Sequence, residues 1–125
     1  MRIIITINHI VLNAEIDQSP TAKAVASALP IRGAANVWGD EIYFDIPVDI
    51  PLADDAREEV EVGTLAYWPT GNAFCIFFGP TPVSTGAEPR AYSPVNIFGH
   101  VIGDVGVLKS VVQGAPVIVS SGDER

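Results

Sequence analysis

The N-terminal part of the chain alternates between apolar and polar residues in the manner of paired β-strands. Residues 2–7 are rich in β-branched side chains, and along residues 10–16 apolar and polar positions follow one another with a period of two. The turn-prone Asn8 lies between these two segments. A period of two places alternate side chains on one face of a strand. The pattern therefore predicts a β-hairpin at the start of the chain.

Helical spacing replaces this alternation after residue 18. Ser19 is suited to cap a helix and Pro20 to occupy its first turn, and Pro30 ends it. The apolar stripe of this predicted helix consists of Ala22, Val25, Ala26 and Leu29. A second helix is predicted between Asp104, as its cap, and Gly114, with the inward residues Leu108, Val111 and Val112.

The middle of the chain again has strand periodicity. Along residues 40–48, Ile42, Phe44 and Ile46 share one face. Further strands are predicted at residues 64–68, 73–78, 94–102 and 115–120, with a turn at residues 69–72. The proline-rich and acidic residues 47–61 are interpreted as a solvated connection with at most one helical turn, and residues 79–94 as an irregular loop.

Many short strands with few helices predict a mainly β fold. We expect a closed antiparallel β-barrel with about two short capping helices. The whole of it forms one domain, residues 1–121, and residues 122–125 form a disordered polar tail.

Composition narrows the classes of partner. A formal charge of −8 and a pI of about 4.4 argue against nucleic acids and anionic lipid surfaces, which need a basic protein face. No apolar run approaches the ~20 residues that span a membrane. The single cysteine, Cys75, fits a reducing compartment, so a cytoplasmic protein is expected. His9 and His100 stand apart from other ligand residues, and no fingerprint of a nucleotide cofactor occurs, so we expect neither a metal nor a cofactor.

The order of these elements and several motifs resemble the cyclophilins. Residues 19–22 (SPTA) are similar to the start of the first cyclophilin helix, and residues 75–78 (CIFF) and 95–101 (VNIFGHV) to two of the family's strands. A more specific resemblance, over nearly the whole chain, is to a small prokaryotic family of cyclophilin-like proteins of uncharacterised function. Its pattern lies in residues 38–44 (WGDEIYF), 62–69 (VGTLAYWP) and 71–82 (GNAFCIFFGPTP).

The resemblance implies that the catalytic residues of cyclophilins have been replaced. With Pro47 as the anchor, the family's active-site arginine falls on Phe44, its glutamine on Ile76 and its histidine on Val95, while the phenylalanine of the proline pocket is retained as Phe78. In the family these side chains share one outer face of the barrel. An aromatic ring cannot donate the hydrogen bond that assists rotation about a prolyl amide, so isomerase activity should be weak or absent.

Three further residues are candidates for binding a ligand. Arg90 and Tyr92 fall where cyclophilins have one edge of their pocket, and Arg90 could supply a single fixed charge or a substitute catalytic group. Alternatively, Arg90 pairs with a nearby carboxylate such as Glu88. Asn72 could orient a ligand amide or could serve only in its turn. Phe44 and Phe78 could equally be core residues.

Three functions remain open on this basis. The first is a binding module whose apolar groove holds a proline-containing peptide or a small ligand without catalysis. The second is a divergent peptidyl-prolyl isomerase that uses Arg90. The third is an interaction subunit, because cyclophilin-like barrels also occur as domains of larger amide-hydrolysing enzymes in prokaryotes; the apolar face would then be a protein interface. The sequence does not determine the oligomeric state.

Overall fold

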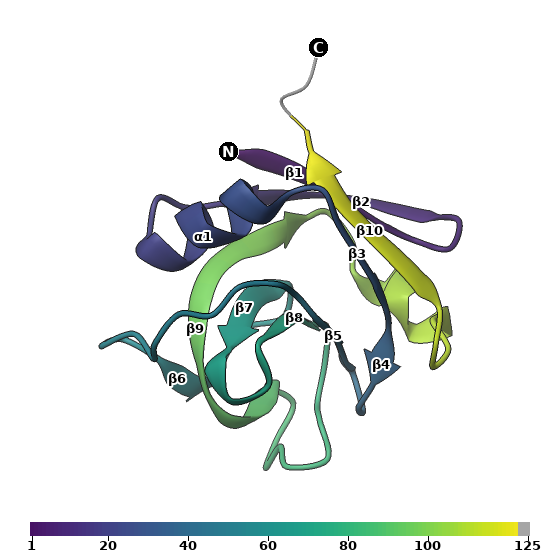
Figure 1. The fold of residues 1–125 in the computed structure, drawn as a ribbon. Helices are drawn as coiled ribbons and strands as arrows, with labels where there is room; N and C mark the ends of the chain where they lie inside the picture. Colours follow the sequence, from purple (N-terminus) through teal and green to yellow (C-terminus); the bar gives the residue numbers. More distant parts are fainter. Residues whose placement is uncertain (123–125) are drawn as a thin grey trace.

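The computed structural model describes residues 1–122, which form a curved antiparallel sheet with one α-helix (Figure 1). The helix is α1 (Pro20–Ala28), and two short 3-10 helices are η1 (Pro69–Gly71) and η2 (Gly106–Ser110). The strands are β1 (Arg2–Ile7), β2 (Ile10–Ile16), β3 (Ile31–Ala34), β4 (Asn36–Val37), β5 (Glu41–Asp45), β6 (Arg57–Glu59), β7 (Thr64–Trp68), β8 (Ala73–Phe77), β9 (Arg90–Ile102) and β10 (Pro116–Ser121). The mainly β fold predicted from the sequence is confirmed.

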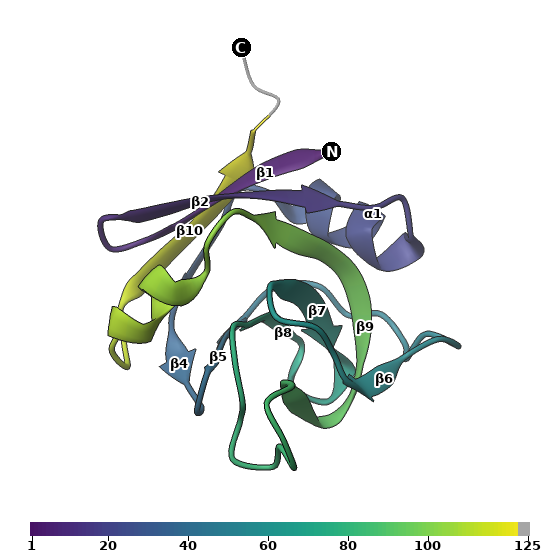
Figure 2. The same cartoon turned by 180° about the vertical axis from the view of Figure 1, so that it is seen from behind.

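The sheet surrounds its core without closing into a hydrogen-bonded barrel. Its strand order is β3-β10-β1-β2-β9-β7-β8-β5-β4, and β6 pairs separately with β9 (Figures 1 and 2). The two end strands, β3 and β4, are consecutive in the chain and separated only by Ala35. β3 and β4 therefore belong to one continuous segment that passes from one edge of the sheet to the other, and these two strands do not pair with each other by backbone hydrogen bonds. The closed barrel was therefore the wrong expectation, because the last gap is bridged by the covalent chain.

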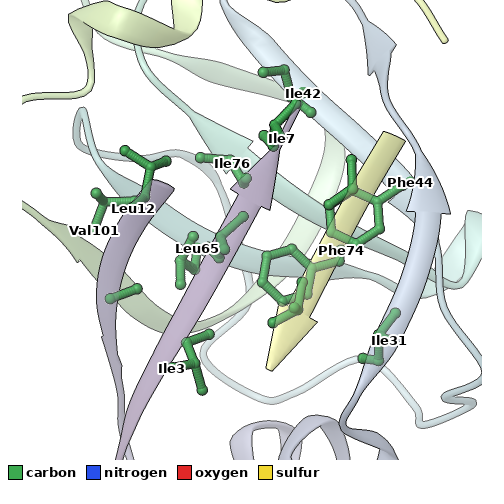
Figure 3. Packing of buried hydrophobic residues seen from close by; sticks show 14 of the residues in the cluster. Ile3, Ile7, Leu12, Ile31, Ile42, Phe44, Leu65, Phe74, Ile76 and Val101 are labelled. Carbon is green, nitrogen blue, oxygen red and sulfur yellow. The ribbon is translucent and has the colours of Figure 1, made fainter. Parts of the chain in front are cut away.

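The main core lies inside this curved sheet. Side chains from β1, β2, β5, β7 and β8 converge there with the rings of Phe44 and Phe74, which stack at a centroid distance of 4.9 Å (Figure 3). Both rings are fully buried. Gly33 allows β3 to approach this stack, because a Cβ atom at that position would lie 3.3 Å from the Phe44 ring.

Helix α1 forms as its sequence predicts. The Ser19 hydroxyl accepts a hydrogen bond from the Ala22 N–H at 3.1 Å, and Pro20 occupies the first turn. The predicted second helix is instead the 3-10 helix η2, in which Leu108 is buried; beyond its end Val111 is also buried, whereas Val112 is 64% exposed. Asp104 binds only the Gly106 N–H, so the tight turn that follows it uses 3-10 rather than α geometry.

Some connections contain strands that the sequence pattern did not reveal. The acidic segment includes β6, the residues after α1 form β3 and β4, and β9 begins at Arg90 within the predicted loop. These strands are short or lie at an edge, where polar residues are normal and the period of two is lost. Of the predicted tail, Gly122 donates its N–H to the Arg2 carbonyl at 2.8 Å, and residues 123–125 lie outside the described residues.

A substitution at Phe44 tests its place in the core. We expect Phe44→Ala to lower the free energy of unfolding by about 3–5 kcal/mol, because it removes a fully buried ring from a packed stack. Val112→Ala, at an exposed position, should change it by less than about 0.5 kcal/mol. Urea denaturation measures both. Equal stability of the two variants would contradict the burial of Phe44.

Candidate functional site

The apolar face expected from the resemblance does not exist as one surface. Phe44 and Ile76 belong to the main core (Figure 3), as does Phe78, whereas Val95 lies in a separate cluster on the other side of the sheet. The expectation that Phe44, Ile76 and Phe78 lie on an outer face is therefore wrong, because all three side chains are buried in the main core. The period of two in residues 40–48 groups Phe44 with Ile42 and Ile46, and the structure shows that this shared face is the core side. Phe44 is fully buried, so it also cannot form a protein interface.

The outer face of β7 and β8 carries a second buried cluster. Its members come from the alternate positions of these strands and from the residues that cover them: Val60, Ala66, Ala73, Cys75, Phe77, Ala91 and Val95, with Tyr43, Trp68 and Ile97 at the margin. The cover is supplied by the first half of β9 and by β6, which pairs with it. Both faces of β8 are consequently buried.

A pocket opens where this cover ends. Its volume is about 170 Å³, and it is lined by Trp38, Glu41, Tyr43, Trp68, Ala91, Tyr92 and Val95. Ala91 and Val95 are almost fully buried and form an apolar floor, while Tyr92 is 71% exposed at the rim. Two of the predicted binding residues, Tyr92 and Val95, are therefore brought together in this pocket.

Local backbone geometry fixes the two indole rings. Trp38 and Glu41 exchange backbone hydrogen bonds of 2.9 and 3.2 Å across a tight turn, in which Gly39 has φ +60°. Trp68 donates its indole N–H to the Ser93 hydroxyl at 2.7 Å. Its ring lies against Gly71, where a Cβ atom would come within 2.6 Å of the indole. Both tryptophans of the chain are thus walls of this pocket.

Tyr92 is placed between the two tryptophans. Its ring meets Trp38 edge to face at 6.2 Å and Trp68 at 6.1 Å, with interplanar angles of 71° and 79°. Such arrangements of aromatic rings are favourable, because the positive edge of one ring meets the negative face of another. An exposed tyrosine is in this way held over the pocket by its two neighbours.

Glu41 is the acidic group of the pocket. Its side chain is only 6% exposed, and burial raises its pKa to about 7, while a hydrogen bond from the Cys75 thiol opposes this shift. Cys75 lies on the neighbouring strand β8, on the same outer face, and is itself fully enclosed. Burial and the nearby Glu41 raise the pKa of the Cys75 thiol, so the thiol stays protonated and unreactive.

Arg90 and Asn72 have partners elsewhere in the protein. The guanidinium of Arg90 lies 2.8 Å from Glu58 and 3.5 Å from Glu59, and Arg90 does not line the aromatic pocket. The carboxylate partners expected for Arg90 are therefore present, although they are not Glu88. Asn72 has φ 50°, and its side-chain amide donates hydrogen bonds to the Val48 carbonyl and the Tyr67 hydroxyl. Asn72 therefore has the structural role in its turn that was the alternative to ligand binding.

Besides Ala91, sequence reasoning missed four residues of the pocket: Trp38, Glu41, Tyr43 and Trp68. A signal was available, since all four lie in the motifs at residues 38–44 and 62–69 that carry the family resemblance. Tyr43 also has the opposite parity to the core residues of its strand. Among residues 1–122, no group of three or more His, Cys, Asp or Glu side chains could hold a metal ion, and no helix is long and apolar enough to cross a membrane.

The buried carboxyl group makes stability depend on pH. In the unfolded chain Glu41 has a pKa near 4.5, so between about pH 4.5 and 7 the unfolded state releases a proton that the native state keeps. The native state is therefore penalised as the pH rises through this window, by about 3 kcal/mol in full. Relative to the wild type, we expect the free energy of unfolding of Glu41→Gln to increase by that amount from about pH 4.5 to pH 8. Urea denaturation at the two pH values measures it.

The control for this experiment is Asp45→Asn, an exposed position on the same strand. The difference in free energy of unfolding between this variant and the wild type should be the same at both pH values. Parallel stability curves for the wild type and Glu41→Gln would show that Glu41 ionises as freely in the folded protein as in the unfolded chain.

Comparison with known proteins gives a family and a fold. A family model described as cyclophilin-like matches residues 1–120. The solution structure of a hypothetical protein from Archaeoglobus fulgidus is similar with a TM-score of 0.83 and 38% identity, over 98% of this chain and 95% of that one. A search of curated proteins gives no match. The match over almost the entire sequence, together with a relative of this identity, shows that this protein belongs to the cyclophilin-like family.

Proposed function

We propose that this protein is a ligand-binding module whose site is the aromatic pocket, and that it binds its ligand without prolyl isomerisation. The observation that carries the proposal is the pocket itself: an apolar floor, aromatic walls and one convergent carboxyl group. Concave sites of this composition are the usual form of small-molecule and side-chain binding sites. The proposal keeps the binding module expected from the sequence but transfers it from the core residues to the outer face.

The arrangement of the rings favours binding over a purely structural role. Tyr92 keeps 71% of its surface exposed although its ring contacts two tryptophans. Aromatic side chains provide a large contact area with few rotatable bonds, so a ligand that covers them loses little entropy in the protein. An occupant would bury the exposed ring and displace water from the floor formed by Ala91 and Val95.

The size of the pocket limits what enters it. A cavity of roughly 150 Å³ accommodates a guest of the size of benzene, so about 170 Å³ accommodates one compact group rather than an extended peptide. A proline ring of a peptide, or a small free ligand, meets this limit. The rest of a larger ligand would lie outside the rim at Tyr92.

The lining lacks the group on which prolyl isomerisation depends in cyclophilins. None of the seven lining residues is an arginine. The nearest candidate from the sequence, Arg90, is held by Glu58 and Glu59. The barrier to rotation about a prolyl amide is about 20 kcal/mol, and the lining offers no guanidinium to lower it.

Binding can be followed by NMR with a panel of small compounds and an N-acetylproline amide as probes. The indole N–H signals of Trp38 and Trp68 should shift, because both line the pocket. Tyr92→Ala should weaken binding by about 1 kcal/mol, or roughly fivefold. Val11→Ala, at an exposed position outside the pocket, should leave binding unchanged. A panel in which no compound shifts either indole signal would refute the proposed site.

The absence of isomerisation has its own test. NMR exchange on an X–Pro peptide should show the same cis–trans rate with and without the protein. A rate enhancement that disappears in Arg90→Ala would reject the binding-only proposal and favour the divergent isomerase instead.

A further inference from the structure

We infer that the ligand of the aromatic pocket is an organic ammonium cation whose nitrogen carries compact apolar groups, as in a methylated amine. This inference rests on the proposed function, because it names the class of ligand for the same site. It is drawn from the combination of aromatic walls with one enclosed carboxylate, on a protein that is itself strongly acidic.

The walls have the composition of a site for such a cation. Four of the seven lining residues, namely Trp38, Tyr43, Trp68 and Tyr92, are aromatic. The face of an aromatic ring is electron-rich, and cages of such rings are the typical site for quaternary and methylated ammonium groups. Tryptophan is the strongest of these partners, and this pocket contains both of the chain's tryptophans.

Glu41 distinguishes a cation from a neutral ligand. Glu41 is 6% exposed, the thiol of Cys75 near it is neutral, and no basic residue lines the pocket among the described residues. A neutral apolar occupant would exclude water from this carboxylate and leave it without a counter-charge, which is unfavourable. A cation would supply the missing charge. The other titratable groups facing Glu41 are Tyr43 on its own strand, Tyr92 on β9 and Cys75 on β8.

The charge of the whole protein supports the same sign of ligand. With a formal net charge of −8, the protein attracts cations and repels anions. Lys109, the basic side chain near this turn, is bound to Asp40 at 2.8 Å rather than to Glu41. Such a methylated ammonium group occurs both in free small molecules and in methylated lysines of peptides. The chemistry of binding in the pocket is the same for both.

Choline and its neutral isostere 3,3-dimethylbutan-1-ol provide the test. The two differ in charge but scarcely in shape, and quenching of Trp38 and Trp68 fluorescence reports their binding. We expect choline to bind about tenfold more tightly. This preference should fall in Glu41→Gln, which keeps the aromatic walls but removes the charge, and it should also fall in Trp38→Leu, in which Trp68 remains as the reporter. Folding of both variants is checked by circular dichroism and by binding of the isostere. A trimethyllysine peptide and its unmethylated counterpart, run in parallel, distinguish a protein-borne cation from a free one.

Choline affinity should also rise with pH across the range in which Glu41 loses its proton, and it should be independent of pH in Glu41→Gln. Selective binding of choline or of the trimethyllysine peptide, reduced in Glu41→Gln, supports the inference. Equal binding of choline and the isostere, or binding of the isostere alone, overturns the inference and leaves the proposed function intact. Binding of none of these probes, together with a failed NMR panel, would overturn both.

Discussion

The fold depends on covering the sheet at β7 and β8 on both faces. The residues of β8 are all buried, with Phe74 and Ile76 toward the main core and Cys75 and Phe77 toward the outer cluster. Such a strand would expose a row of apolar side chains if either face were left open, and that exposure would oppose folding. The 13-residue strand β9 meets this need, because it pairs with β2 and β7 in one half and turns across the outer face with β6 in the other.

The pocket is the place where this outer cover stops. Beyond Ala91 and Val95 the sheet is no longer roofed by strand, and the aromatic rings of Trp38, Trp68 and Tyr92 form the walls. Glu41 lies at that boundary, with a carboxyl group enclosed enough to raise its pKa to about 7. A protein that needed only to cover its sheet would be more stable with an apolar residue at this position, and the retained acid accords with the binding role proposed for the pocket.

Much of the fold could be predicted because it is encoded locally. The β1–β2 hairpin, α1 with its Ser19 cap, and the β7–β8 pair follow from periodicity and from turn and capping residues. The edge strands β3, β4 and β6 could not, since their partners are distant in sequence and their own pattern is weak. The site was predicted only at Tyr92 and Val95. The resemblance pointed instead to Phe44 and Ile76, which the structure places in the main core.

By itself the sequence determined the mainly β class and the family resemblance, and it showed that Ile42, Phe44 and Ile46 share one face without deciding whether that face is the core side. Only the tertiary structure decided that the sheet ends at β3 and β4 on either side of Ala35, and that Trp38, Glu41, Trp68 and Tyr92 meet. The physical reason is the distance along the sequence over which each interaction acts. Periodicity and caps act between residues a few positions apart, whereas the pocket joins residues separated by up to 57 positions (38 to 95), brought together by strand pairing and by the path of β9.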